Sequence, residues 1–266
     1  MTTETRKMPA LFLGHGNPMY AIQPNRYADG WSQLAQSLPR PKAIIAISAH
    51  WYIDHTAVTA MERPRTIHDF GGFPQALFDV QYPAPGSPEL AQRIAQLLAP
   101  LEVRLDKDEQ HGWGLDHGTW SVLLHLFPQA DIPVVQLSID ATQPPAWHHA
   151  LAKQLAPLRD EGVLILGSGN IVHNLRLINW SASAPAYDWA ERFSEWVRTQ
   201  LRANNRQALI DYLSAGKDAR LSVPTPDHYL PLLYVIAQQQ AGEVFGLPMS
   251  GIDMGAIDMQ VVTVGD

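Results

Sequence analysis

Short apolar runs bounded by glycine and proline alternate along the chain with longer stretches of helical period. The runs are continuous and rich in isoleucine, valine and leucine, which predicts strands that are buried on both faces of a sheet. These buried strands are predicted at residues 9–13, 43–48, 132–139 and 163–167. Two further segments alternate between apolar and polar residues and predict half-buried strands, an edge strand at 101–105 and a closing strand at 257–264.

Segments of helical period separate the predicted strands. The helices are predicted at residues 88–99, 118–126, 145–159, 187–203 and 227–240. Strands that alternate with helices build crossover units around one sheet. We therefore expect an α/β fold, with a central mostly parallel or mixed β-sheet and helices on both faces. No repeat or long linker interrupts the pattern, so residues 1–266 are expected to form a single domain.

Composition restricts the chemistry and the partners. The 266 residues include 11 histidines and no cysteine, so any metal must be bound by His, Asp or Glu. A net charge of −7 argues against nucleic-acid binding, which needs a basic face. No segment reaches the roughly 18 uncharged apolar residues of a membrane helix, and the first residues lack the apolar stretch of a signal peptide. We expect a cytoplasmic protein without nucleic-acid or membrane partners.

Several histidines lie near the ends of predicted strands. His15 and His50 close the first two strands, and His173 follows a later one. Ligands of open α/β sheets bind beyond the carboxyl ends of the strands, so this placement can bring the three imidazoles to one crevice. His228 is predicted in the first turn of a helix capped by Thr225, where the helix dipole keeps its imidazole neutral and able to bind a metal. The alternative for each is a hydrogen-bonded structural histidine.

His117 lies in the stretch WGLDHGTW, between two tryptophans and two glycines and just before a predicted helix. Glycine permits a close approach of the backbone to a ligand, and aromatic rings offer a flat apolar wall. A buried turn histidine with structural hydrogen bonds is the alternative interpretation.

The histidine pattern suggests a metal site of a particular kind. Three neutral imidazoles with an open position describe a catalytic zinc site, whereas non-haem Fe(II) enzymes more typically use two histidines and one carboxylate. Ligand types alone therefore favour zinc over iron. The chain has no G-x-S-x-G elbow, P-loop, complete dinucleotide fingerprint or HExxH helix. A zinc-dependent hydrolase using metal-bound hydroxide and a non-catalytic metal-binding protein remain as alternatives.

Longer motifs resemble a known family. They include PALFLGHGNPM (9–19), ISAHW (47–51), GLDHGTW (114–120), GSGNIVHNL (167–175) and PTPDHYLPLLYV (224–235). These segments resemble the 4,5-DOPA extradiol dioxygenase family of the class III extradiol ring-cleavage dioxygenases. The resemblance implies an α/β fold with one divalent metal and O₂-dependent cleavage of a catechol ring beside, not between, its hydroxyls. DOPA, cleaved at the 4,5 bond to seco-DOPA, the precursor of betalamic acid and muscaflavin, is the implied substrate.

The resemblance also implies roles for five histidines. His15 and His50 match metal ligands, and His228 occupies the third ligand position of this branch. His173 matches a histidine that is either a fourth ligand or an acid/base group. His117 matches the second acid/base histidine.

One departure from the wider superfamily concerns the third ligand, which is elsewhere a glutamate. Members of this branch are associated with Zn²⁺ as well as Fe²⁺. Zinc does not change oxidation state, so oxygenation requires iron, and a zinc enzyme would have another reaction. Phe70, Phe73 and Trp113 are candidate walls for an aromatic substrate, with a core role as the alternative for each.

Overall fold

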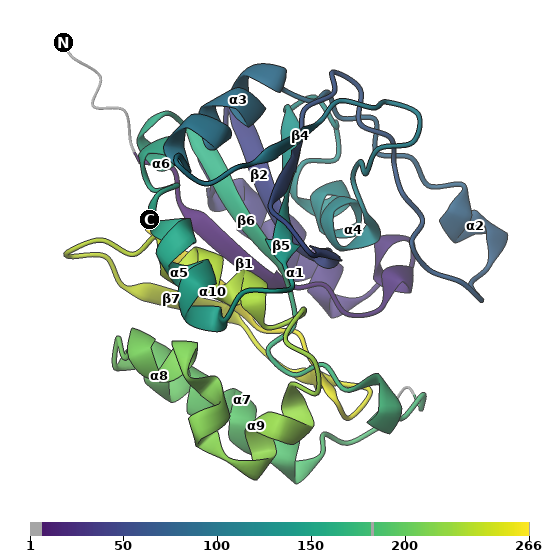
Figure 1. Ribbon diagram of the computed structural model, residues 1–266. Coiled ribbons are helices and arrows are strands. Elements are labelled where there is room, and N and C mark those ends of the chain that lie inside the picture. Colours follow the sequence, from purple (N-terminus) through teal and green to yellow (C-terminus); the bar gives the residue numbers. More distant parts are fainter. Residues whose placement is uncertain (1–6, 182–183, 266) are drawn as a thin grey trace.

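An eight-stranded mixed sheet runs through the centre of the molecule in a computed structural model that describes residues 7–181 and 184–265 (Figure 1). The strand order is β4-β3-β5-β2-β6-β1-β10-β7. The strands are β1 (Ala10–Gly14), β2 (Ala43–Ile53), β3 (Ala57–Thr59), β4 (Arg104–Asp106), β5 (Val134–Asp140), β6 (Val163–Gly169), β7 (Phe245–Met249) and β10 (Val261–Val264). The central strands β5, β2, β6 and β1 are parallel, whereas β10 and β7 continue the sheet in antiparallel fashion. Two short strands, β8 (Ile252–Asp253) and β9 (Ile257–Asp258), pair separately.

Helices cover both faces of this sheet. The helices are α1 (Arg26–Ser37), α2 (Gln75–Phe78), α3 (Pro88–Leu97), α4 (His117–Leu126), α5 (Pro145–Lys153), α6 (Pro157–Asp160), α7 (Asp188–Arg202), α8 (Arg206–Ile210), α9 (Lys217–Ser222) and α10 (Leu230–Ile236), with the 3-10 turns η1 (Pro18–Ala21), η2 (Leu175–Leu177) and η3 (Tyr212–Ala215). Helices α1 and α4 pack on one face, and α3, α5 and α10 on the other. Helices α7, α8 and α9 pack together beside α10 (Figure 1). Within the described ranges, no helix has the length and apolar character needed to cross a membrane.

Burial on both faces explains the continuous apolar runs. In β1, Ala10 and Phe12 contribute to one hydrophobic core, whereas Leu11 and Leu13 contribute to the other. All four are fully buried because side chains alternate between the two faces of a strand and both faces are covered. The predicted fold class is confirmed. The carboxyl ends of the parallel strands are left free to carry a site.

Three predicted elements end or break where backbone hydrogen bonding changes. The segment predicted as one helix at 145–159 divides into α5 and α6, because Pro157 lacks the N–H that would continue the helix. The strand predicted at 257–264 divides into β9 and β10, and between them the N–H of Gln260 donates to the Asp258 carboxylate at 2.9 Å. The predicted edge strand at 101–105 is observed only over three residues, as β4.

The helix predicted at 227–240 begins later, at Leu230. The chain before it forms a turn in which the N–H groups of Tyr229 and Leu230 donate to the carbonyl of Pro226 at 2.9 Å. The prediction that His228 lies in a helical first turn capped by Thr225 is therefore wrong. His228 lies in the turn that leads into α10.

Candidate metal centre

Five histidines converge at the carboxyl ends of β1, β2 and β6. His15 follows β1 directly, His50 lies inside β2, and His173 lies in the loop after β6. His117 is the first residue of α4, and His228 lies just before α10. Their ring centroids are 5.0 Å apart for His15 and His50, 3.9 Å for His50 and His117, and 5.2 Å for His50 and His228. His173 stacks on His228 at 3.4 Å, so all five predicted histidines meet in one place.

The imidazole of His15 is hydrogen-bonded to Ser168 of β6. Its Nδ1 lies 3.0 Å from the Ser168 hydroxyl, which donates its own proton to the carbonyl of Gly118 at 2.5 Å. Ser168 therefore accepts a hydrogen bond from His15, and the imidazole proton must be on Nδ1. This arrangement leaves a lone pair on Nε2 of the buried His15 ring.

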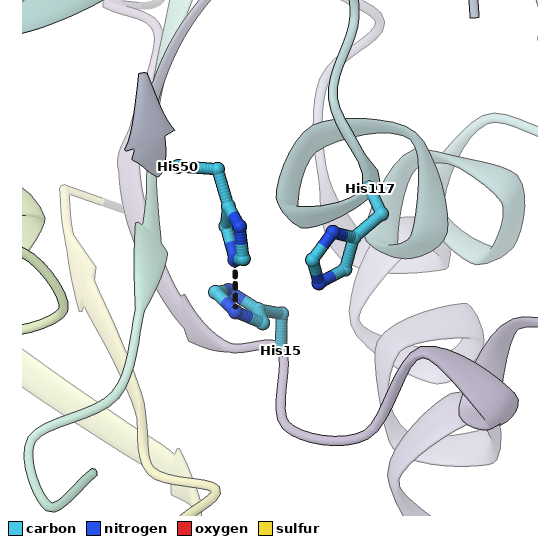
Figure 2. Close-up of side chains that lie close together, drawn as sticks. All are labelled: His15, His50 and His117. Atoms are coloured by element: carbon cyan, nitrogen blue, oxygen red, sulfur yellow. Dashed lines mark hydrogen bonds between the residues drawn. The ribbon is translucent and has the colours of Figure 1, made fainter. Parts of the chain in front are cut away.

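The His50 ring has its Nε2 atom facing the Nε2 atom of His15. Its Nδ1 lies 2.9 Å from Oδ2 of Asp69, and a carboxylate favours a proton on the nitrogen that faces it. The Nε2 atoms of His15 and His50 are then 3.1 Å apart, as the dashed line in Figure 2 shows. Two lone pairs at this distance need a positive charge between them, either a proton in a hydrogen bond between the two rings or a shared metal ion. Two nitrogens that bind one tetrahedral zinc ion are separated by about 3.3 Å, so the pair fits a shared metal.

His228 offers a third free nitrogen. Its Nδ1 is hydrogen-bonded to the carboxylate of Asp227, and its buried Nε2 has no hydrogen-bond partner among the residues that the structure describes. The backbone around it is tightly held, because the N–H of Asn170 donates to the His228 carbonyl at 2.9 Å. A Cβ on Gly169 would lie only 2.2 Å from that carbonyl oxygen, so glycine is required for the approach. A buried imidazole nitrogen without a hydrogen-bond partner is suited to bind a metal ion.

The nitrogen positions define two compact groups. His15, His50 and His117 have ligand atoms that all lie within 4.8 Å of one another, and so do His173, Asp227 and His228. The first group contains two of the three predicted ligands and the predicted acid/base His117, which lies beside them in Figure 2. His228 faces the same pair from the other side, 5.3 Å from His15 between ring centroids. The donor set of neutral imidazoles suits zinc or iron.

Burial keeps most of these imidazoles neutral, as metal binding requires. Burial, with the neighbouring histidines, lowers the pKa of His15 and of His228 well below the usual value. Burial also lowers the pKa of His173, to about 4. His50 differs: burial acts to lower its pKa, but the contact with Asp69 and other nearby carboxylates outweighs it, and the pKa is raised.

A buried polar network holds His117 at the start of α4. Asp116 caps the helix by accepting from the N–H of Thr119 at 3.1 Å, and it accepts from the Ser48 hydroxyl of β2 at 2.7 Å. The backbone N–H of His117 donates to Oδ1 of Asp69 at 2.9 Å. Burial and the nearby His50 lower the pKa of His117, and Asp69 offsets this only in part.

A cavity of about 550 Å³ opens over the histidines. Phe70 and Phe73 line it, as predicted, and the Phe70 ring lies edge-on to His117 with the centroids 5.4 Å apart. The structure does not bring Trp113 to this cavity. Its ring stacks on Trp51 at 5.7 Å, and its N–H donates to Asp116 at 3.2 Å. The lining also includes residues that the sequence reasoning missed, among them Asp69, Leu175, Ile178, Trp180 and Met254.

The fold and the site define a metal-dependent ring-opening dioxygenase, and comparison with known proteins shows this class directly. Residues 9–239 match the family described as the catalytic LigB subunit of aromatic ring-opening dioxygenase, and the chain belongs to this family. Enzymes of this family use a catalytic metal, which agrees with the histidine cluster.

Individual relatives show which members of this family the chain resembles. The chain is 52% identical to the 4,5-DOPA dioxygenase extradiol of Escherichia coli (strain K12), over 97% of this chain and 95% of that protein. It is 39% identical to the 4,5-DOPA dioxygenase extradiol of Beta vulgaris, over 91% and 90% of the two chains. A crystal structure of an uncharacterized Escherichia coli K12 protein superposes with a TM-score of 0.85 at 46% identity, covering 97% of this chain and all of that one. The resemblance seen in the sequence is confirmed, and the chain is a 4,5-DOPA extradiol dioxygenase-like enzyme.

Proposed function

We propose that residues 1–266 act as a single catalytic domain that cleaves DOPA at the 4,5 bond with O₂ to give seco-DOPA. The observation that carries the proposal is the set of three imidazoles whose Nδ1 atoms are engaged. The Nε2 atoms of His15 and His50 face each other, and the Nε2 of His228 has no hydrogen-bond partner among the described residues. His15, His50 and His228 would hold one divalent metal through these Nε2 atoms. When bound, Fe(II) supplies the redox partner for O₂ and lowers the pKa of catechol hydroxyls. The names of the relatives support DOPA as the substrate.

The remaining histidines suit proton transfer. His173 lines the cavity and is neutral at pH 7, so its free nitrogen can accept a proton from a catechol hydroxyl. Its stacking on His228 keeps it beside the ligand set. A fourth-ligand role for His173 is the alternative that the same position allows. His117 would accept the second catechol proton at its Nε2 and give it to the oxygen anion that develops as the ring opens.

The residues that line the cavity determine how it can bind the aromatic ring of a substrate and the substituent on that ring. Phe70, Phe73, Leu175, Ile178 and Trp180 all line the cavity, and of these Leu175 and Trp180 are exposed to solvent. Trp180 is 72% exposed, so a substrate that covers it would remove apolar surface from water. Among the described residues that line the cavity there is neither lysine nor arginine. A negatively charged substituent therefore finds no lysine or arginine in the part of the lining that the structure describes and is best accommodated where it reaches solvent.

This lining predicts a ranking of catechols. DOPA carries its charges on a chain long enough to reach the mouth, whereas protocatechuate carries its carboxylate directly on the ring. An unpaired buried polar group costs about 1–3 kcal/mol, and more if it is charged, which corresponds to roughly 5- to 150-fold or more in kcat/KM. We expect DOPA and 4-methylcatechol to be cleaved with kcat/KM at least about tenfold above that of protocatechuate. Equal or better turnover of protocatechuate would show that a cation reaches the bound ring.

The function itself is tested by loading the apoprotein with different metals. Protein reconstituted with Fe(II) without air, then given DOPA and air, is expected to form a yellow ring-cleaved product. The zinc-loaded protein is expected to form none, because zinc cannot exchange electrons with O₂. No product from the iron protein with any of several catechols would contradict the proposal. Hydrolytic turnover by the zinc protein without O₂ would support the hydrolase instead.

A further inference from the structure

Asp69 lines the cavity and contacts two of its histidines. It is the one carboxylate among the described residues that line the cavity, and its side chain is 15% exposed. Its Oδ2 lies 2.9 Å from Nδ1 of His50, and its Oδ1 lies 2.9 Å from Nδ1 of His117. The backbone N–H of His117 also donates to Oδ1 at 2.9 Å. One carboxylate therefore contacts two imidazoles from two different elements, β2 and α4.

We propose that Asp69 is a positioning residue that joins a metal ligand, His50, to an acid/base group, His117. This inference rests on the proposed function. An ionised carboxylate only accepts protons, so it favours the Nδ1–H tautomer of both rings at once. The Nε2 lone pair of His50 then faces His15, and the Nε2 of His117 faces the cavity. Asp69 thus sets the metal site and the proton-transfer site through one side chain that makes two contacts.

The loop that carries Asp69 is built to hold it at this point. The N–H of Ile67 donates to the carbonyl of Leu115 at 2.7 Å, and the N–H of Leu115 donates to the carbonyl of Arg65 at 2.9 Å. The indole N–H of Trp120 donates to the carbonyl of Ile67 at 2.8 Å. These bonds attach the loop to the residues on both sides of the α4 N-terminus. Asp69 is therefore held against α4 by backbone bonds that do not depend on its own side chain.

The other two proposed ligands, His15 and His228, each have one side-chain partner at Nδ1. Ser168 contacts the ring of His15, and Asp227 contacts the adjacent ring of His228. Loss of Asp227 should weaken metal binding through one imidazole. Loss of Asp69 should weaken metal binding and also disturb His117. The comparison of Asp69→Asn with Asp227→Asn therefore isolates what is particular to Asp69.

The experiment measures two quantities for each variant: the dissociation constant for Zn²⁺ by chelator competition, and kcat with DOPA at saturating Fe(II). Asp69→Asn is expected to bind Zn²⁺ about 10–100-fold more weakly and to lose at least about tenfold in kcat at saturating Fe(II). Asp227→Asn is expected to lose a similar amount of affinity and distinctly less kcat. Asp79→Asn, an exposed change on the same loop where the carboxylate contacts only Gln75, is the matched control and should leave both values near wild type.

A double variant supplies the decisive comparison. In a His117→Ala background, Asp69→Asn is expected to weaken Zn²⁺ binding as before but to reduce kcat little further, because its effect on proton transfer acts through His117. Asp69→Glu retains the carboxylate and should recover part of both losses, which separates a positioning role from simple misfolding. Full recovery of kcat in Asp69→Asn at saturating Fe(II), or unchanged Zn²⁺ affinity, would overturn the proposal. If the wild type has no dioxygenase turnover, the proposed function fails, and the Zn²⁺ affinities still test the contact with His50.

Discussion

Alanine at His15, His50 or His228 is expected to abolish retention of the metal. Each ring presents an Nε2 whose lone pair faces the cluster because its Nδ1 is already engaged, by Ser168 or by a carboxylate. Two imidazoles alone bind a divalent ion far more weakly than three, and removing one opens the site to water. Metal stoichiometry after dialysis, measured by atomic emission, is expected to fall from one ion per chain to near zero.

An exposed histidine provides the control for these three variants. His55 lies outside the cluster and contacts the neighbouring Asp54, so His55→Ala should keep a full complement of metal. Full occupancy in any of the three cluster variants would show that the residue concerned is not a ligand. His228→Ala is the most informative of the three, because the compact group of His15, His50 and His117 offers a competing third ligand.

Alanine at His117 is expected to have the opposite effect: the metal stays and turnover is lost. The ring of His117 lies 3.9 Å from that of His50 between centroids, and Asp69 lies beside its Nδ1, so its Nε2 is available for proton transfer. General acid/base groups contribute about 10²–10⁴-fold to rate, and a loss of kcat in this range is expected at full metal occupancy. Steady-state kinetics on protein of measured metal content supplies the test.

The metal content of the His117→Ala protein decides between two arrangements of the cluster. Retention of one ion per chain with loss of kcat supports His228 as third ligand and His117 as proton donor. Loss of the ion would instead make His117 a ligand and would contradict the roles proposed here.

The positions of His15 and His173 after their strands could be predicted because they follow from local sequence. Continuous apolar runs mark parallel strands buried on both faces, and the carboxyl ends of such strands meet at one edge. His15 and His173 indeed follow β1 and β6. His50 lies inside β2 instead of at its end, because β2 continues to Ile53.

Other features depend on contacts between segments that are distant in the sequence, so the local sequence pattern could not predict them. Asp69 reaches the site because its loop is hydrogen-bonded to residues near α4, about fifty positions away along the chain. His148 and His149 fall in the helix predicted at 145–159, and both are buried in α5. His148 contacts the Tyr234 hydroxyl of α10 at 2.9 Å, and only the packing of the two helices creates that environment.

The origin of the product oxygen tests the central claim most directly. Iron-loaded protein is given DOPA under oxygen-18 gas, and the product is analysed at once by mass spectrometry. Cleavage beside the hydroxyls predicts a seco-DOPA product whose new carboxylate carries oxygen-18 from the gas. A product without the label, or equal turnover when O₂ is excluded, would contradict the account.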